Sequence, residues 1–447
     1  MSANWKPCVA LGLAVMIAAG CGRSEPKEEA IPDGEPEEQT VPDATPDAAP
    51  SAYAPAVEDF GETPVEVMPQ ADVKAIQVSA DGLLKYLLAA RENRDRLSMA
   101  LMSLSEADQE RVRGAKLDAR AMLGLLGAPS LKPGEYSVGA VSKIGERMMA
   151  EATLLESGKP VAKRLFFVRS GFRWQAELFL SALTGPAAAV PNATYARLEE
   201  VADKALLLDI IDVLAAAEEV DMLGGFGRAL IAGAAKAGDE DAADRMLDSL
   251  NRVPPSVQGM FAKALARIGG NRSLAAVVAL LDHADESVST AAFEALCAWQ
   301  GEEAAKPLLE LADKDEARRE AALKGYVAVA DQVAAKTPDK ALAMLREAFQ
   351  RAQADETKRA VVAALGNVSS PAALKEARKH LADDELAGTA GRSVFTIAGN
   401  IWRTSEKEAV SALQALAKES KDNRLVRDVN GLLSSIDKAK KEQAGKK

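Results

Sequence analysis

Aromatic residues, cysteines and histidines are scarce in this 447-residue chain. Aromatic side chains make up 4% of it, and there are three cysteines and two histidines. So few cysteines exclude a disulfide-stapled framework, and two histidines without a His-x-x-x-His or Cys-x-x-Cys spacing exclude the common zinc motifs. Hydrophobic residues make up 48% of the chain, and alanine and leucine are abundant. This composition favours closely packed helices that are stabilised by packing alone.

The amino-terminal segment has the layout of a secretory signal. Lys6 and the terminal amine are positive, residues 7–20 carry no charge, and small side chains precede Cys21. The apolar run is shorter than the roughly 20 residues that span a bilayer. The sequence Ile17-Ala18-Ala19-Gly20-Cys21 resembles the lipobox of bacterial lipoproteins, with Ala18 where leucine is usual.

The lipobox resemblance implies that residues 1–20 are a lipoprotein signal peptide and that Cys21 is lipidated after their removal. Cys21 then anchors the protein to a bacterial membrane in the cell envelope, facing the periplasm or the exterior. Cys8 leaves with the signal, so Cys297 has no cysteine to pair with. An ordinary signal peptide followed by an incidental cysteine is the alternative.

Residues 21–75 are acidic and rich in proline. Between residues 22 and 75, 14 acidic side chains stand against three basic ones, a difference equal to the net charge of −11 for the whole chain. Nine prolines lie between residues 22 and 70. Such a segment cannot offset its ordering entropy, so we expect a disordered, extended spacer. The remainder is nearly neutral, which argues against nucleic acid as a partner.

Residues 76–185 are expected to form a small α+β domain. Leucines recur at three- and four-residue steps as far as Gly127, which indicates helices, and Ser105 is placed to cap one of them with Asp108 reaching back. From residue 133 the period changes to two, and Gly171 within Arg169-Ser170-Gly171-Phe172 indicates a hairpin. Helices followed by an antiparallel meander are typical of the α+β class.

This stretch resembles the cone-shaped α+β domains of the nuclear-transport-factor-like and cystatin-like families. The resemblance rests on residues 166–174, Phe-Phe-Val-Arg-Ser-Gly-Phe-Arg-Trp, which are similar to the final hairpin of secreted members. Some of these cones are enzymes with an Asp–His pair, but no histidine precedes His283 here. A small-molecule pocket lined by Tyr136, Phe167 and Trp174 is one interpretation, and core packing of these aromatic side chains is the one we favour.

Residues 192–437 repeat one helical template, an alanine with leucines four and seven residues later. Exact and looser copies begin at Ala243, Ala276, Ala304, Ala341, Ala373 and Ala409, at intervals of 28 to 37 residues. A second helical stretch follows each copy. Paired helices with a period of this length predict an α-solenoid.

The array resembles the short HEAT-like repeats of bacteria. Residues 280–288 and 313–323 share that family's leucine-rich helix, Asp-x-Asp-type turn and helix of small residues. Tetratricopeptide repeats have a similar period, but their Trp-x-x-Leu-Gly-x-x-Tyr opening is absent. Residues 198–217 and 222–237 are expected to form a divergent first repeat. The lysine-rich residues 438–447 are expected to be a frayed tail.

The sequence offers no constellation for catalysis, a cofactor or a metal ion. His283 and His380 follow first helices beside acidic turns, where the helix dipole favours a cation. Gly224-Gly225-Phe226-Gly227 lacks the lysine of a phosphate loop and indicates a helix break or close packing. Cys297 lies among large apolar residues, so we expect a small buried hydrophobe rather than a nucleophile.

Four basic residues at the starts of second helices are the candidate partner-binding residues. They are Arg318, Arg319, Lys358 and Arg359. In HEAT repeats such residues typically pair with turn acids of neighbouring repeats, and Asp313, Asp315 and Asp355 are available here. We favour this structural ladder over a docking patch.

The expected fold is mainly α, with a C-terminal α-solenoid of HEAT-like helix pairs and a smaller N-terminal α+β domain after a disordered linker. We expect a lipid-anchored envelope protein that scaffolds an unidentified protein partner without enzymatic activity. The alternatives are a small-molecule-binding protein with a pocket in the α+β domain and a purely architectural protein. No cofactor, metal or nucleic acid is expected.

Overall fold

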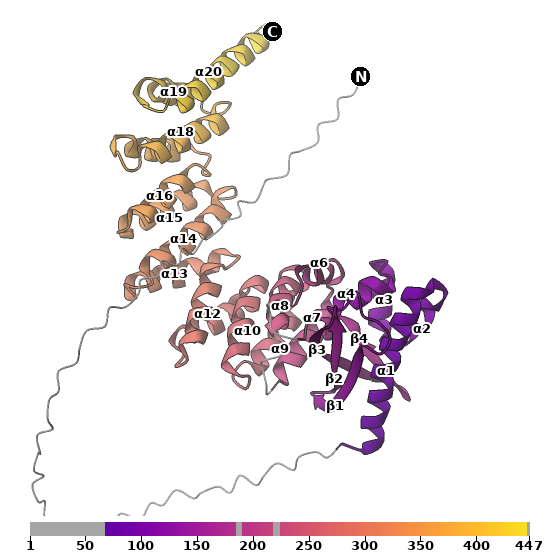
Figure 1. Cartoon of the computed structure of the whole chain (residues 1–447). Coiled ribbons are helices and arrows are strands. Elements are labelled where there is room, and N and C mark those ends of the chain that lie inside the picture. Colours follow the sequence, from indigo (N-terminus) through magenta and orange to yellow (C-terminus); the bar gives the residue numbers. More distant parts are fainter. Residues whose placement is uncertain (1–67, 185–189, 218–223, 445–447) are drawn as a thin grey trace, which may run out of the picture. The chain divides into compact units, whose positions relative to one another are not determined.

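The computed structural model describes residues 68–184, 190–217 and 224–444 (Figure 1). Within these ranges an α+β part comes first and a run of helices follows. The predicted signal peptide, Cys21 and most of the predicted linker lie outside the described residues. No helix of the described ranges is both long and apolar enough to cross a membrane.

Residues 68–184 combine helices with one antiparallel sheet. The helices are α1 (Gln70–Glu92), α2 (Leu97–Met102), α3 (Glu106–Gly114), α4 (Ala119–Leu125) and α5 (Leu178–Ala182). The strands are β1 (Tyr136–Ile144), β2 (Arg147–Glu156), β3 (Lys159–Ser170) and β4 (Arg173–Glu177). They pair in the order β1-β2-β3-β4, which confirms the predicted meander. Because α1 begins at Gln70, residues 70–75, which we assigned to the linker, are helical.

Residues 190–444 are helical throughout their length, apart from turns. Three helices come first: α6 (Asn192–Val201), α7 (Lys204–Ala215) and α8 (Gly224–Ala237). The pairs that follow are α9 (Glu240–Ser249) with α10 (Pro255–Ile268), α11 (Asn271–Ala279) with α12 (Glu286–Cys297), α13 (Ala305–Lys314) with α14 (Arg319–Ala334), α15 (Pro338–Arg351) with α16 (Asp355–Leu365), α17 (Pro371–Lys379) with α18 (Ala387–Ile401), and α19 (Glu406–Glu419) with α20 (Asn423–Ala444). From α8 onward, each second helix packs against the second helix of the next pair. The predicted helical repeat array is confirmed.

The divergent first repeat differs from its expected outline. We expected one helix over residues 198–217, but α6 ends at Val201 and α7 starts after Asp203. The Asp203 carboxylate accepts a 2.8 Å hydrogen bond from the backbone N–H of Leu206. An aspartate in this position satisfies an N–H that has no partner within the helix, and so begins a new helix.

The carboxyl-terminal end also differs from its expected form. Helix α20 continues to Ala444, so residues 438–444 are helical rather than a frayed tail. Lys440 on this helix binds Glu406 of α19 with an N–O distance of 2.5 Å.

The sheet has helices on both faces. Successive strand residues point to opposite faces, and Phe166 and Phe167 on β3 are both fully buried. Phe166 meets Phe226 of α8 edge-on, with ring centroids 6.1 Å apart. On the opposite face, which carries Phe167, Tyr136 donates a 3.0 Å hydrogen bond to Asp81 of α1. The sheet therefore lies between α1 and the first repeat.

One hydrophobic core is shared by the α+β part and the repeats. Its main cluster extends from Ile76 of α1 to Ile436 of α20. Template residues of the repeats belong to it, and Ala304, Leu308 and Leu413 are fully buried. Alanine at these positions lets helices approach closely at the density of protein interiors. The two expected domains are thus joined by a packed interface between residues 68–184 and helices α6 to α8, which we call the joint.

Candidate functional site

Arg318, the first of the predicted partner-binding residues, is held by three neighbours in the array. Its guanidinium lies over the ring of Phe293 at 5.2 Å and donates a 3.1 Å hydrogen bond to Ser289. It also lies 3.6 Å from the Asp315 carboxylate in the preceding turn. Both Phe293 and Ser289 belong to α12, so Arg318 connects two successive repeats.

The other three predicted residues contact groups of their own helix pairs. Arg319 donates a 3.0 Å hydrogen bond to the backbone carbonyl of Ala312. Lys358 lies 3.7 Å from the Asp355 carboxylate, and Arg359 donates to the Asp355 carbonyl over 3.3 Å. Arg318 and Arg319 lie at the very start of α14, whereas Lys358 and Arg359 lie one turn into α16, so the four cations do not occupy equivalent places in the two repeats. Their role in partner binding stays a prediction.

Ion pairs between neighbouring repeats are formed mainly by residues that the sequence did not single out. These pairs include Arg245–Asp212, Arg272–Asp244, Lys263–Glu294, Lys324–Glu356, Arg346–Glu376 and Arg351–Asp313. We expected Asp313 to form an ion pair with an arginine at the start of a second helix. It forms one with Arg351 of α15, which is the first helix of its pair. Most of these side chains are well exposed, so each pair contributes little, about 0–1 kcal/mol.

The two histidines have structural partners. Nδ1 of His283 accepts a 3.0 Å hydrogen bond from the backbone N–H of Asp285. His380 packs against Phe349 with ring centroids 4.5 Å apart, and burial lowers its pKa. A lowered pKa favours the neutral imidazole, so packing, rather than the cationic attraction that we expected, accounts for His380. No group of three or more His, Cys, Asp or Glu in the described ranges could hold a metal ion.

Cys297 is a partly buried thiol that packs against the core. Burial raises its pKa to about 12, so the thiol stays protonated at neutral pH. The thiolate is the reactive form of cysteine. This environment is that of the inert packing residue that we expected.

The sheet face that carries Tyr136, Phe167 and Trp174 is covered by side chains. Phe167 is fully buried, as are Leu83 and Leu87 of the covering helix α1. Trp174 lies under the guanidinium of Arg169, 5.9 Å from the ring centroid. The packing interpretation therefore describes these aromatic residues better than a ligand pocket does.

The glycine cluster lies at the joint and permits close packing. Helix α8 begins at Gly224, and Gly225 and Gly227 are buried. A Cβ atom at Gly225 would overlap the backbone carbonyl oxygen of Leu183, just after α5. A Cβ at Gly227 would lie 3.0 Å from the sulfur of Met260 on α10. The cluster therefore brings the first repeat against the α+β part.

A first charged cluster at the joint is centred on Arg111 of α3. Its guanidinium binds Asp108 on the same helix and Asp203 at the start of α7, both at 2.8 Å. Asp108 is 2% exposed and also accepts a hydrogen bond from the backbone N–H of Phe179. Burial raises the pKa of Asp108. We expected Asp108 to reach back to its helix start; Ser105 does cap that helix, but the Asp108 carboxylate binds Arg111 and the backbone N–H of Phe179 within the α+β part instead.

A second charged cluster is centred on Arg147 at the start of β2. Arg147 binds Glu177 on β4 at 2.9 Å and Asp209 on α7. Burial raises the pKa of Glu177 to about 7, although the Arg147 charge opposes this shift. Every charged group of the two clusters has an ionic partner within the chain, which is the arrangement of a structural joint rather than of a reactive site.

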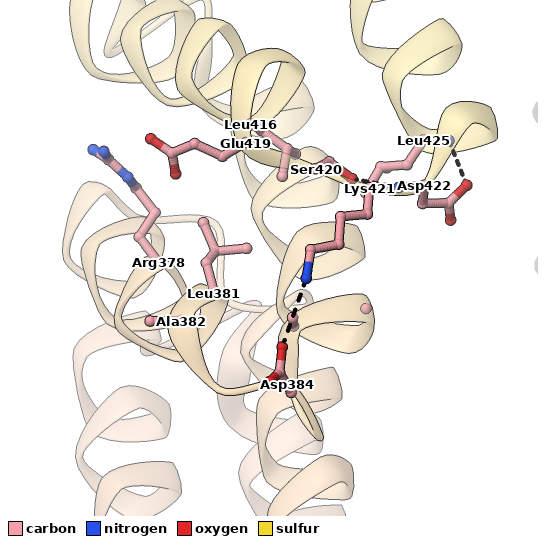
Figure 2. A pocket seen from close by; sticks show the side chains of 12 residues that line it. Arg378, Leu381, Ala382, Asp384, Leu416, Glu419, Ser420, Lys421, Asp422 and Leu425 are labelled. Atoms are coloured by element: carbon pink, nitrogen blue, oxygen red, sulfur yellow. Dashed lines mark hydrogen bonds and ion pairs between the residues drawn. The ribbon is translucent and has the colours of Figure 1, made fainter.

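The last two repeats form an open pocket of about 450 Å³. Figure 2 shows that it lies between the end of α17, the start of α18 and the turn from α19 to α20. Its apolar surface comes from Leu381, Leu416 and Leu425. Arg378 and Glu419 extend on one side of it (Figure 2). Sequence reasoning missed this pocket, because its residues come from the four helices α17 to α20 and two of the turns between them, which only the repeat stacking brings together.

A second, wider groove of about 760 Å³ lies between α17 and α19. Arg378 lines both hollows, so they are neighbours. Lys375 and Lys407 line the second groove together with Glu408. The side chains of Lys375, Arg378 and Lys407 are exposed and make no hydrogen bond or ion pair with another described residue. The groove between α17 and α19 thus offers three basic side chains and one acidic side chain. The pocket beside it offers leucine side chains together with charges of both signs, including Asp384, Glu419 and Lys421.

Comparison with known families identifies one match. A family model for HEAT repeats matches residues 243–326, which comprise most of α9 to α14. The HEAT-like character that we predicted for the repeats is supported over this range. No curated protein matches the chain.

Proposed function

We propose that this protein is a membrane-anchored lipoprotein of the bacterial envelope that acts as a non-enzymatic scaffold for a protein partner. The observation that carries the proposal is the series of helix pairs, of which residues 243–326 match the HEAT-repeat model, with an open groove across its last two pairs. The part of this groove between α17 and α19 is lined by three basic side chains and one acidic side chain. Stacked repeats supply extended binding surfaces, and HEAT repeats typically serve as scaffolds. The covered face of the sheet gives no comparable support to small-molecule binding.

Anchoring rests on Cys21 and its lipobox. In the native host, Cys21→Ala is expected to move the protein from the membrane fraction to the soluble fraction, because no acyl chain can then be attached. Cys297→Ala is the matched control, since it removes the other cysteine of the processed chain and leaves the anchor intact. Membrane association of the Cys21→Ala protein equal to that of the wild type would contradict the anchor.

The partner that best fits the groove is an extended polypeptide with carboxylate and apolar side chains. Lys375, Arg378 and Lys407 would bind its carboxylates, and the leucines of the pocket would cover its apolar side chains. Rim charges act mainly on association rate and salt dependence. The groove therefore predicts binding that weakens with salt.

Affinity capture from native membranes tests the scaffold. We expect a specific partner to co-purify with the wild type and to be lost with Lys375→Glu combined with Arg378→Glu. Lys306→Glu is the control, because Lys306 is an exposed first-helix lysine of another repeat, with a side chain 85% accessible. Equal recovery of the partner with the double variant would exclude the groove, and recovery of no specific partner by the wild type would contradict the scaffold.

A further inference from the structure

The exposed large hydrophobic side chains of the described residues all lie in the α+β part. They are Val78, Tyr86, Met99, Met102 and Phe172. The most exposed is Phe172, whose accessibility of 102% means that no described residue covers it. Single exposed hydrophobic side chains are common on protein surfaces, so what distinguishes Phe172 is its position in the fold and the charges around it.

Phe172 is held at the tip of the β3–β4 hairpin. Ser170 and Arg173 are the last paired residues, so Gly171 and Phe172 form a two-residue loop. Gly171 has a φ of +59°, while Phe172 is not among the residues with positive φ. Glycine at the first loop position is typical of the type II′ turn, which matches the twist of a hairpin. The tip is therefore a tight turn that presents Phe172 on a rigid support.

The hairpin around Phe172 is positively charged. Residues 165–176 contain Arg169 and Arg173 and no acidic side chain. Both arginines are exposed, and alternation along the strands places them on opposite faces of the hairpin. Arg169 lies over the half-buried Trp174, and the side chain of Arg173 makes no hydrogen bond or ion pair with another described residue. Two cations thus flank one protruding aromatic ring.

We propose that this hairpin is a second, weak membrane contact, in which Phe172 enters the head-group region of an anionic bilayer while Arg169 and Arg173 bind lipid phosphates. Aromatic side chains favour the membrane–water boundary, and basic side chains are attracted to anionic lipids. Two arginines beside a single protruding ring, in a hairpin without acidic side chains, are complementary to an anionic lipid surface. The proposal rests on the proposed anchor at Cys21.

The anchor places the hairpin within reach of the bilayer. Residues 22–67 separate Cys21 from the α+β part, and a chain of that length spans at most about 150 Å. Tethering of this kind gives an effective concentration on the order of millimolar, so even a contact of low intrinsic affinity is populated. The anchor would hold the protein at the membrane, and the hairpin would orient it there.

Vesicle sedimentation tests the contact independently of the anchor. The protein is residues 21–447 with Cys21→Ser, which carries neither the signal nor a lipid. It is expected to bind vesicles of phosphatidylcholine with phosphatidylglycerol, and to bind pure phosphatidylcholine much more weakly. Phe172→Ser should reduce binding about tenfold. Arg169→Gln with Arg173→Gln should reduce it about fivefold for each arginine.

Met99→Ser is the matched control, because Met99 is another exposed hydrophobic residue of the same part, 46% accessible. It should bind vesicles like the wild type. Since the Phe172 side chain is fully exposed among the residues that the structure describes, its substitution should leave the circular dichroism spectrum unchanged. Failure of the wild-type protein to bind anionic vesicles would overturn the proposal. Binding of Phe172→Ser to these vesicles as strong as that of the wild type would overturn it as well. If Phe172→Ser leaves vesicle binding unchanged but abolishes the capture of a particular protein, the hairpin tip binds that protein instead of the membrane.

Discussion

The joint and the interfaces between repeats hold neighbouring helices together in different ways. At the joint, the largely buried Arg111 and Arg147 each bind one buried carboxylate of the α+β part and one more exposed carboxylate on α7 or at its start. Two aromatic rings meet edge-on there, and a glycine permits contact with a backbone carbonyl. Between repeats, alanine and leucine form the core, and the ion pairs lie mostly at the surface. The joint thus depends on a few exact partners, whereas each repeat interface depends on many interchangeable apolar contacts.

This difference indicates what the α+β part does for the array. A stack of helix pairs leaves an apolar surface at its first pair, and repeat proteins cover such ends with capping elements. Here the sheet covers that surface, with Phe166 against Phe226 and Arg147 against Asp209. Because the contacts at the joint are directional, they set one orientation of the α+β part on the first repeat.

The largest effect should follow from Arg111→Met. This change leaves the buried Asp108 without its cation, and breaking one side of a buried ion pair costs about 3–5 kcal/mol. Arg245→Met removes an exposed pair with Asp212 between two repeats and should cost under about 1 kcal/mol. Chemical denaturation of both variants measures the contrast, and equal losses would contradict the distinction between joint and repeats.

A somewhat smaller loss is expected from Gly225→Ala. The added methyl group meets the Leu183 backbone, which cannot move as a side chain can, so the free energy of unfolding should fall by about 2–4 kcal/mol. The control is Gly388→Ala in α18, where a Cβ meets nothing within 4 Å and alanine should raise stability by up to about 1 kcal/mol. Thermal unfolding monitored by circular dichroism compares them. A tolerated Gly225→Ala would show that the close approach is not required.

The pH dependence of stability should identify a buried lysine beside the joint. Lys163 is 4% exposed and donates hydrogen bonds to the carbonyls of Ala182 and Thr184, and burial lowers its pKa to about 8. Between pH 8 and its usual pKa near 10.5, the unfolded chain holds the proton that the folded chain has lost. Stability therefore rises with pH across this window, by up to roughly 3 kcal/mol from this group.

Lys163→Met should abolish this rise, because methionine does not titrate. Denaturation midpoints of the wild type and the variant at pH 8 and pH 10 provide the measurement. Parallel pH profiles for the two proteins would mean that the amine is hydrated in the folded state.

The smallest effect should come from a histidine within the repeats. Burial against Phe349 lowers the pKa of His380, so the unfolded chain binds a proton more readily as the pH falls below about 6.5. His380 should therefore lower the stability of the array slightly as the pH falls from 7 to 5. His380→Gln should remove that dependence, as measured by urea denaturation at the two pH values. An unchanged profile in the variant would locate the pH response elsewhere.

Periodic features of the chain were predictable because periodicity reflects burial on one face. The leucines around Leu83 and Leu87 predicted a helix, and the spacing of Ala304 and Leu308 predicted the repeat. The hairpin was predictable from Gly171, because few residues other than glycine adopt a positive φ. The partners of single charged residues were not predictable, since nothing in the sequence around Asp108 points to Arg111 and Phe179 together.

The sequence by itself determined the helical repeat, the antiparallel meander and the signal-like start, because each is encoded by spacing or composition along the chain. Only the tertiary structure decided that the sheet packs on the first repeat, that Asp108 and Lys163 are buried, and that two repeats form a groove beside Arg378. These features depend on residues that are distant in sequence and meet in space. Burial, close approach and charge pairing at such contacts are properties of the packed chain.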